Sequence, residues 1–472
     1  MEENNKKVKS LSLSTKSFIV SMVIILALMI FSYVLTFILP AGAFDTALDS
    51  NGNNLIVPGT YHEVRSSFNF LNFIFSPILV LGSDGNLLLI AILLFLLVIG
   101  GTFQVLNDQG IIEYLLKKLI NKFYKKRYIL LIILPTIFML LASCAGCFEE
   151  IIPLVPLMVA LAISLGWDNN IGIGFSIFAC GCGYAAGIIN PFGTGVAQKV
   201  AGDVSVFSGV WFRIIVFIVL DLVLTLFLLF KAKKIEKKNP DFKVDYDDNF
   251  KKDKKLDHAV YSLLIILGIG ILIIVCSTFL TFLQDYTLYI FAFCFLLASV
   301  VSSICGGTKT KTFFKSFLNG VITMLPAALM ILCASSIKYI LQESSRLDTL
   351  INYLLNATNN LSPYALILFI YLIVLLVEFF IPSGSAKAFL LIPLILPIAK
   401  LSGLSTNLVV LAYIFGDGLA NVIYPTNPGL LISLNLANSS YGEFIKKNWL
   451  LIITLLVSTV LLLCFGLAIS YY

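Results

Sequence analysis

Long apolar runs separated by short polar segments dominate this 472-residue chain. Several runs reach the roughly 20 residues with which an α-helix crosses the hydrocarbon core of a bilayer. The first of them, residues 17–39, is too long for the core of a signal peptide, so we interpret it as a retained span. The pattern predicts an all-α polytopic membrane protein with about nine full spans. They are expected near 17–39, 87–106, 170–200, 207–231, 258–283, 286–304, 316–341, 405–435 and 448–470.

Two further regions are interpreted as re-entrant helical hairpins, in which two apolar arms flank a polar tip. In the first, residues 128–165, the arms are shorter than a standard span and the tip reads SCAGCFEE (143–150). In the second, residues 363–400, the tip reads PSGSAK (382–387). The short apolar segment 68–80 is expected at the membrane interface or packed against other helices.

The second half of the chain repeats the element order of the first. The amphipathic stretch 106–120 matches 341–355, and both follow a span, so we expect interfacial connecting helices. The interrupted helix sequence IINPFGTG (188–195) matches VIYPTNPG (422–429). Such paired interruptions are typical of secondary transporters built from inverted repeats. The predicted units are a cytoplasmic N-terminus (1–16), a first repeat (17–231, with hairpin 128–165 and broken helix 170–200), a charged cytoplasmic linker (232–257) and a second repeat (258–472, with hairpin 363–400 and broken helix 405–435).

Charged residues make up only 12% of the chain, about half the share of a soluble domain. The net charge of +6 comes from Lys/Arg clusters in a few loops, among them 117–127 and 231–255. Such loops stay on the cytoplasmic side of a membrane, so they indicate topology and not a nucleic-acid partner. They predict a cytoplasmic N-terminus and a C-terminus outside, with the two hairpins entering from opposite sides.

Nine cysteines lie almost entirely in apolar segments, and the chain has only two histidines. Cys144 and Cys147 form a CxxC, and Cys180 and Cys182 form a CxC. A zinc or redox site would need further ligands in a recognisable spacing. We therefore expect packing roles for the cysteines, and neither a metal nor a cofactor.

The first tip places Glu149 and Glu150 at a depth where a charged side chain costs at least about 3 kcal/mol. Non-helical backbone at that depth is tolerated only against protein or a water-filled cavity, so the tips and broken helices are expected to surround one central cavity. Successive helical positions point about 100° apart, so one glutamate is expected to line the cavity while the other pairs or caps. The alternative is that both only cap the following helix.

The second tip combines small hydroxyl residues with a lysine. Ser383, Gly384 and Ser385 offer hydroxyls and amide N–H groups at a helix start, which suits an anion. Lys387 adds a positive charge, with extension to the interface or pairing with Glu378 as the alternative.

Polar residues in the broken helices are further candidates for holding polar ligand groups or a sodium ion. Their alternative role is to satisfy the backbone groups that the breaks set free. Asp417 and Asn421 lie four residues apart on one helical face nearby. The candidates within the breaks are Asn190, Thr194, Thr426 and Asn427.

The charge inventory of the expected cavity leans acidic. Glu149, Glu150 and Asp417 stand against Lys387 alone. A purely anionic substrate would meet net repulsion. A small molecule with one carboxylate and one or two cationic groups fits better, with the hydroxyl tip holding the carboxylate and the acidic residues holding the amino and basic groups.

A resemblance to a known family covers nearly the whole chain, residues 17–470. It rests on CAGCFEEIIPLVPLMVALAISLGWD, GCGYAAGIINPFGTGVAQKVAG, PSGSAKAFLLIPLILPIAKLSGLS and GDGLANVIYPTNPG. This pattern resembles the YfcC-type basic amino acid antiporters. These arginine/ornithine exchangers are grouped with the anaerobic four-carbon dicarboxylate carriers in the ion transporter superfamily.

The resemblance implies a fold of two inverted repeats, with substrate held between the hairpin tips. It also implies a transport domain that moves against a scaffold domain, a homodimer, and residence in a bacterial cytoplasmic (inner) membrane. Sodium-coupled relatives carry Ser-Asn-Thr at the tips. Here the corresponding residues are Ser143-Cys144-Ala145 and Ser383-Gly384-Ser385. This difference favours exchange or proton coupling over sodium coupling. The resemblance also adds Ser143 to the candidate substrate contacts.

The leading hypothesis is an exchanger of arginine for ornithine, which needs no coupling ion because both substrates carry the same charge. The alternative is a carrier of dicarboxylates or short-chain acids, coupled to sodium or protons, that uses Lys387 and the hairpin amides.

An intramembrane aspartyl protease is disfavoured, because Ile414 occupies the position of the first glycine of a GxGD motif. Hairpins with broken helices also fit alternating access better than an open channel. We therefore expect a transporter and not an enzyme.

Overall fold

The structure is a computed structural model that describes residues 15–471, apart from 49–53, 84–86, 203, 206, 239–251, 278–279, 281–282, 284–285 and 359–360. The described part is almost entirely helical, as predicted, and ten of its helical stretches are long and apolar enough to cross a membrane. Eight of the nine expected spans are among these ten stretches. The ninth, 405–435, is instead divided into the shorter helices α17 (Thr406–Ala420) and α18 (Pro428–Leu436). The other two are α16 (Gly384–Leu401) of the second hairpin and the continuous stretch Ile111–Ala145, which contains α4 and α5. Residues 1–14 and half of the predicted linker lie outside the described residues.

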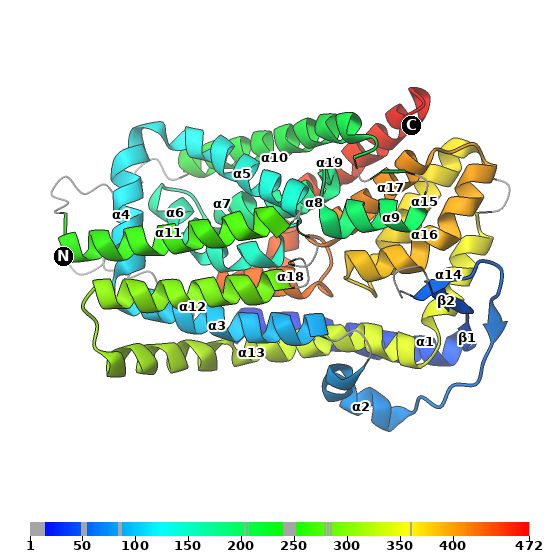
Figure 1. The fold of residues 1–472 in the computed structure, drawn as a ribbon, viewed down its shortest axis with the longest axis horizontal. Coiled ribbons are helices and arrows are strands. Elements are labelled where there is room, and N and C mark those ends of the chain that lie inside the picture. Colours follow the sequence, from blue (N-terminus) through cyan, green and yellow to red (C-terminus); the bar gives the residue numbers. More distant parts are fainter. Residues whose placement is uncertain are drawn as a thin grey trace.

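Six helices pack together into what we name the framework group. Helix α13 is the longest of them and packs along both α1 and α3, while α11 and α12 form an antiparallel pair beside α3 (Figure 1). Apolar side chains such as Leu272, Phe293 and Leu318 remain exposed on the outside, as a lipid-facing surface requires. The members are α1 (Thr15–Ile38), α2 (Phe70–Leu79), α3 (Leu87–Asp108), α11 (Lys254–Ser277), α12 (Thr287–Cys305) and α13 (Thr310–Glu343).

Most of the remaining helices and helical turns form the hairpin group, which contains both hairpins and both broken helices. Its centre is the packing of α8 against α5 and α17, so each broken helix is buried against elements from the other half of the chain. The members are α5 (Arg127–Ala145), η3 (Glu149–Leu154), α6 (Val155–Ser164), α7 (Asn169–Ile173), η4 (Gly174–Phe178), α8 (Ala179–Ala186), η5 (Pro191–Gly195), α9 (Val196–Ala201), α10 (Val210–Lys238), α15 (Pro363–Glu378), α16 (Gly384–Leu401), α17 (Thr406–Ala420), α18 (Pro428–Leu436) and α19 (Tyr441–Ala468).

The two groups are connected by the amphipathic helices α4 (Ile111–Phe123) and α14 (Leu347–Asn356), where the sequence predicted connecting helices. Helix α4 leads from α3 into the first hairpin, and α14 leads from α13 into the second. Figure 1 shows α4 at one end of the molecule and α14 at the other. The halves thus repeat one element order in opposite orientations.

Polar contacts hold each connecting helix to the framework side. Lys118 Nζ lies 2.5 Å from Asp257 Oδ1 and joins α4 to α11. At the other end, the Phe44 N–H donates to Asp348 Oδ2 of α14 at 3.2 Å. Burial raises the pKa of the Asp348 carboxyl, although the bond from Phe44 opposes this shift.

The segment between α1 and α2 contains short strands. Strand β1 (Gly42–Ala43) pairs antiparallel with β4 (His62–Glu63), and β2 (Thr46–Leu48) pairs with β3 (Asn54–Ile56). Segments this short carry no alternating pattern long enough to be recognised in a sequence. The predicted interfacial segment 68–80 is the short helix α2.

Candidate substrate site

The tips of the two hairpins meet at one cavity of about 720 Å³ near the centre of the molecule. The first tip contributes Gly146, Phe148, Glu149 and Glu150, and the second contributes residues 382–385. In Figure 1 the arms α5 and α6 reach the centre from one side, and α15 and α16 reach it from the other. The meeting of the tips follows from the inverted orientation of the two repeats.

The framework group closes the opposite wall of the cavity. Leu87 and Ala91 come from the start of α3, and Thr287, Leu288 and Tyr289 come from the first turn of α12. The cavity therefore lies at the boundary between the two groups, and a displacement of one group against the other would change its shape and access.

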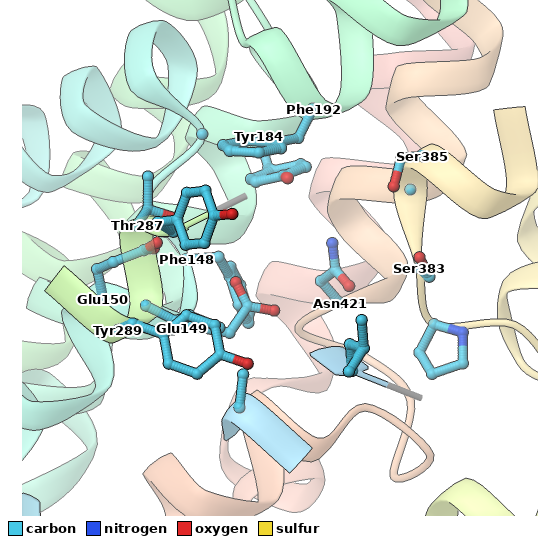
Figure 2. A pocket seen from close by; sticks show the side chains of 17 residues that line it. Phe148, Glu149, Glu150, Tyr184, Phe192, Thr287, Tyr289, Ser383, Ser385 and Asn421 are labelled. Atoms are coloured by element: carbon cyan, nitrogen blue, oxygen red, sulfur yellow. The ribbon is translucent and has the colours of Figure 1, made fainter. Parts of the chain in front are cut away.

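The two glutamates of the first tip both line the cavity, in different surroundings (Figure 2). Glu150 is buried, and its carboxylate accepts a hydrogen bond from the Thr287 side chain while Oε2 has no partner. Glu149 is only partly buried, and no ion pair involving it is found among the described residues. One glutamate is thus held by a neighbour and the other is open to a ligand, although both face the same space.

The capping alternative for these glutamates does not agree with the helix start. Both residues lie in the 3₁₀ turn η3, and α6 begins only at Val155. Its N-cap residue, Leu154, makes no side-chain capping bond. The carboxylates instead accept backbone N–H bonds within the tip, Glu149 from its own N–H and Glu150 from its own and that of Phe148, while both side chains line the cavity.

Aromatic rings line much of the remaining surface. Phe148 and Tyr184 form an edge-to-face pair with ring centroids 6.2 Å apart, and Phe192, Tyr286 and Tyr289 also line the cavity. Aromatic faces attract cations, and their effect adds to that of nearby carboxylates. Among the described residues that line the cavity, none is a lysine, arginine or histidine.

The second tip presents Ser383, Gly384 and Ser385 to the cavity, at the N-terminal end of the 18-residue helix α16. The hydroxyls and the first N–H groups of that helix can donate hydrogen bonds to a carboxylate. Asn421, at the break between α17 and α18, also lines the cavity. Its Oδ1 accepts a bond from Asn427 Nδ2 at 2.6 Å, so the amide is held in place.

Lys387 does not line the cavity, and its charge is already engaged. Its ammonium group is buried between the carboxylates of Glu378 and Asp417, with an Nζ–Oδ1 distance of 2.8 Å to Asp417. The structure shows the alternative considered for Lys387, in which it pairs with Glu378. Asp417 lies with Lys387 behind the second tip and not on the cavity surface.

The polar residues of the first break hold the backbone. Asn190 Oδ1 accepts bonds from the Phe192 and Gly193 N–H groups at 2.9 and 3.1 Å. Thr194 Oγ1 donates to the Gly187 carbonyl at 2.7 Å. From the first hairpin, Ser143 Oγ accepts a bond from the Ile188 N–H at 3.0 Å. The structure thus places these side chains in the support of the broken helix, next to the cavity but not among its lining residues.

The second break is held in a similar way. Asn427 Oδ1 caps α18 by accepting from the Leu430 N–H at 3.0 Å. Thr426 is buried, and its hydroxyl has no hydrogen-bond partner in the described part of the chain. Of the residues predicted from sequence, the structure therefore brings six to the cavity surface. These are Glu149, Glu150, Ser383, Gly384, Ser385 and Asn421.

The sequence reasoning missed the aromatic residues and the framework wall. Tyr184 lies two residues after the CxC and three before the break, so its position next to a polar interruption was the available signal. Thr287 and Tyr289 begin an ordinary span, and tyrosines at span ends are typical of membrane interfaces. The sequence around Thr287 and Tyr289 does not distinguish them from such interfacial residues.

Metal ligands do not gather anywhere in the described part of the chain. No three His, Cys, Asp or Glu side chains come together there. The nine cysteines form no disulfide in the described part of the chain, and Cys147, Cys180 and Cys182 are buried in the core.

Comparisons with known proteins agree with a transport role. The C4-dicarboxylate anaerobic carrier (DcuC) family matches residues 18–467. The chain is 28% identical over 377 residues to the "Putative basic amino acid antiporter YfcC" of Escherichia coli, which covers 76% of this chain and 73% of the relative. It is 23% identical over 407 residues to an "Uncharacterized protein" of Haemophilus influenzae, covering 83% and 77% of the two chains.

Two solved transporter structures are also similar over most of their length. The YdaH transporter of Alcanivorax borkumensis has 16% identity and a TM-score of 0.46, with 96% of this chain and 99% of that chain covered. MtrF of Neisseria gonorrhoeae has 15% identity and a TM-score of 0.42, with 94% of each chain covered.

The family match extends over both hairpins, both broken helices and all the helices that position the cavity. The chain is therefore a membrane transporter that belongs to the C4-dicarboxylate anaerobic carrier family.

Proposed function

We propose that this transporter exchanges basic amino acids, with arginine entering and ornithine leaving. The observation that carries the proposal is the charge of the cavity. Glu149 and Glu150 line it, and no basic side chain does among the described lining residues. A guanidinium or ammonium group would find a carboxylate partner here, whereas a dicarboxylate would meet uncompensated negative charge.

The substrate would be held at both of its ends. Its amino and basic groups would lie against Glu149 and the aromatic rings of Phe148 and Tyr184. Its carboxylate would accept bonds from Ser383, Ser385 and the N–H groups at the start of α16. The two sets of groups come from opposite hairpins, so a molecule with both signs of charge would bridge the tips.

Transport would follow from a sliding of the hairpin group against the framework group, in an elevator-type alternating-access mechanism. Both tips and both breaks belong to the hairpin group, so the binding residues can move together. The framework contributes mainly Thr287 and apolar or aromatic side chains to the cavity. The Thr287–Glu150 bond joins the two groups and would have to break as they move.

By its likeness to the superfamily, we further propose a homodimer in the bacterial cytoplasmic membrane. The lysine-rich loops support a cytoplasmic N-terminus and a C-terminus outside.

A second candidate is a dicarboxylate or short-chain acid carrier, which the family match favours. It would use the second tip alone and would require the acidic groups of the first tip to be neutral. Lys387 cannot readily assist, since its ammonium already pairs with two carboxylates.

Uptake by proteoliposomes distinguishes the two candidates. Vesicles preloaded with ornithine are given labelled arginine, succinate or a short-chain acid, with and without sodium. We expect arginine uptake that depends on internal ornithine and does not depend on sodium. Arginine uptake without internal ornithine would contradict exchange, and uptake of succinate alone would contradict a cationic substrate.

A further inference from the structure

Three ionisable side chains form a buried triad behind the second tip. Glu378 ends α15, Lys387 lies in the first turn of α16, and Asp417 lies near the end of α17. The exposed fraction of each side chain is 1% or less. The triad does not line the cavity, so substrate contact does not explain it.

The triad contains one positive charge for two carboxylates. Lys387 Nζ donates to Asp417 Oδ1 at 2.8 Å and also pairs with Glu378. If both carboxylates were ionised, the cluster would keep one uncompensated negative charge. Such a charge is very costly in a buried site, and a proton on one carboxyl removes it. Ionisable side chains inside membrane proteins commonly mark proton pathways.

Among the described residues, the surroundings of the triad contain no second positive charge that faces it. The Tyr413 ring centroid lies 5.7 Å from Lys387 Nζ, and the Tyr413 hydroxyl donates to the Gly384 carbonyl. Tyr184 of α8 and Glu149 of η3 interact electrostatically with Asp417. Lys199, on the neighbouring helix α9, is exposed. The described groups that face the triad are therefore neutral or acidic.

One carboxylate oxygen of the triad lies next to the cavity wall. Asp417 Oδ2 has no hydrogen-bond partner among the described residues. A Cβ atom placed on Gly384 would lie 2.8 Å from this oxygen, and one on Gly193 would lie 3.4 Å from it. Gly384 itself lines the cavity. This oxygen therefore lies close to the backbone of a lining residue.

We propose that the buried triad is a proton-binding site, in which its two carboxyl groups together hold one exchangeable proton while the cavity is empty. When a cationic substrate enters, the O–H bond of the protonated carboxyl breaks and the proton passes to cavity water. The positive charge of the substrate then replaces that of the proton, and the proton returns when the substrate leaves. An exchanger crosses the membrane loaded in both directions, so exchange itself moves no net protons. The link to substrate rests on the proposed function; the existence of the proton does not.

Infrared spectroscopy of the purified protein tests the proton directly and needs no transport. We expect a C=O stretching band of a protonated carboxylic acid at neutral pH, which shifts in D₂O. Asp417→Asn and Glu378→Gln should each remove the band, because one carboxylate then balances one lysine and no proton is needed. The exposed substitution Glu443→Gln on α19 is the matched control and should retain the band. Absence of the band in the folded wild-type protein, or its persistence in both triad variants, would overturn the proposal.

Proton release on binding tests the link to substrate. In weakly buffered solution with a pH dye, arginine should release close to one proton per bound molecule, and Glu378→Gln should abolish this release. The apparent Kd for arginine should fall by up to about tenfold for each unit by which the pH is raised, in the range where the site is protonated. Arginine binding without proton release would overturn the link. If arginine does not bind, the proposed function fails, and the infrared result still decides whether the triad holds a proton.

Discussion

The two hairpin tips occupy matching positions in the repeats, but their charged side chains are held in different ways. At the first tip, Glu149 and Glu150 face the cavity, and only Glu150 has a side-chain partner, Thr287. At the second tip, the charged residue Lys387 turns away from the cavity into a cluster with two carboxylates, and hydroxyl residues face the ligand space. The first tip thus keeps charge available for a ligand, while the second uses charge to hold its own structure.

The difference predicts which properties each tip controls. Substitutions of charge at the first tip should impair transport with little loss of stability. The same kind of substitution at the second tip should impair stability first.

The largest effect is expected for Lys387→Met. It leaves the buried carboxylates of Glu378 and Asp417 without a cation, which should lower the free energy of unfolding by about 3–5 kcal/mol. Thermal unfolding in detergent measures the loss. Lys199→Met, at an exposed position on α9, is the control and should unfold like the wild type. A Lys387→Met protein of normal stability would mean that the lysine does not stabilise the second tip.

Glu149→Gln should reduce arginine transport about 30- to 160-fold, because a charged hydrogen bond worth roughly 2–3 kcal/mol is lost. The side chain is partly open to the cavity, so the fold should be retained. Initial rates in proteoliposomes, together with the elution profile of the purified protein, measure both quantities. Glu150→Gln should also impair transport and should in addition weaken the contact with Thr287. Wild-type rates in both variants would show that the acidic tip does not bind substrate.

A smaller effect is expected for the double substitution Ser383→Ala and Ser385→Ala. Two hydroxyl donors are lost, while the N–H groups of α16 remain. Apparent affinity for arginine should fall roughly tenfold, as expected for the loss of about 1.5 kcal/mol of hydrogen bonding to a charged carboxylate. Agmatine, which lacks the carboxylate, should compete equally poorly in wild type and variant. If the variant discriminates between arginine and agmatine as well as the wild type, the hydroxyls do not hold the carboxylate.

The smallest effect is expected for Cys144→Ala, on the first tip. Cys144 has neither a disulfide nor a set of metal ligands among the described residues. Stability should change by no more than about 0.5 kcal/mol, and transport should be insensitive to chelators and mild oxidants. A strong response to either reagent that Cys144→Ala abolishes would restore a metal or redox role.

The features that the sequence predicted well are those with long-range periodicity or unusual local composition. Membrane helices, connecting helices and the two tips follow from apolar runs, amphipathic stretches and polar interruptions. Glu149 and Glu150 could be predicted because carboxylates in an apolar run are costly unless they face a polar space.

The features that escaped prediction depend on how separate elements meet. Whether Lys387 faces the ligand or pairs with Glu378 and Asp417 is decided by the packing of α15, α16 and α17, which no single segment encodes. Thr287 and Tyr289 acquire their place in the cavity from the framework group, although their local sequence resembles any span end. The π-helical turns η4 and η5 likewise pack against segments that are distant in sequence, η4 against α5 and η5 against α16 and α17.

Ligand-dependent thermal stability of the purified wild-type protein tests the central claim, that the acidic cavity selects a cation. Ligands that bind only the folded state raise its unfolding temperature. Arginine and ornithine should raise that temperature at concentrations where succinate does not, and Glu149→Gln should remove most of the increase. Stabilisation by succinate but not by arginine would contradict the account.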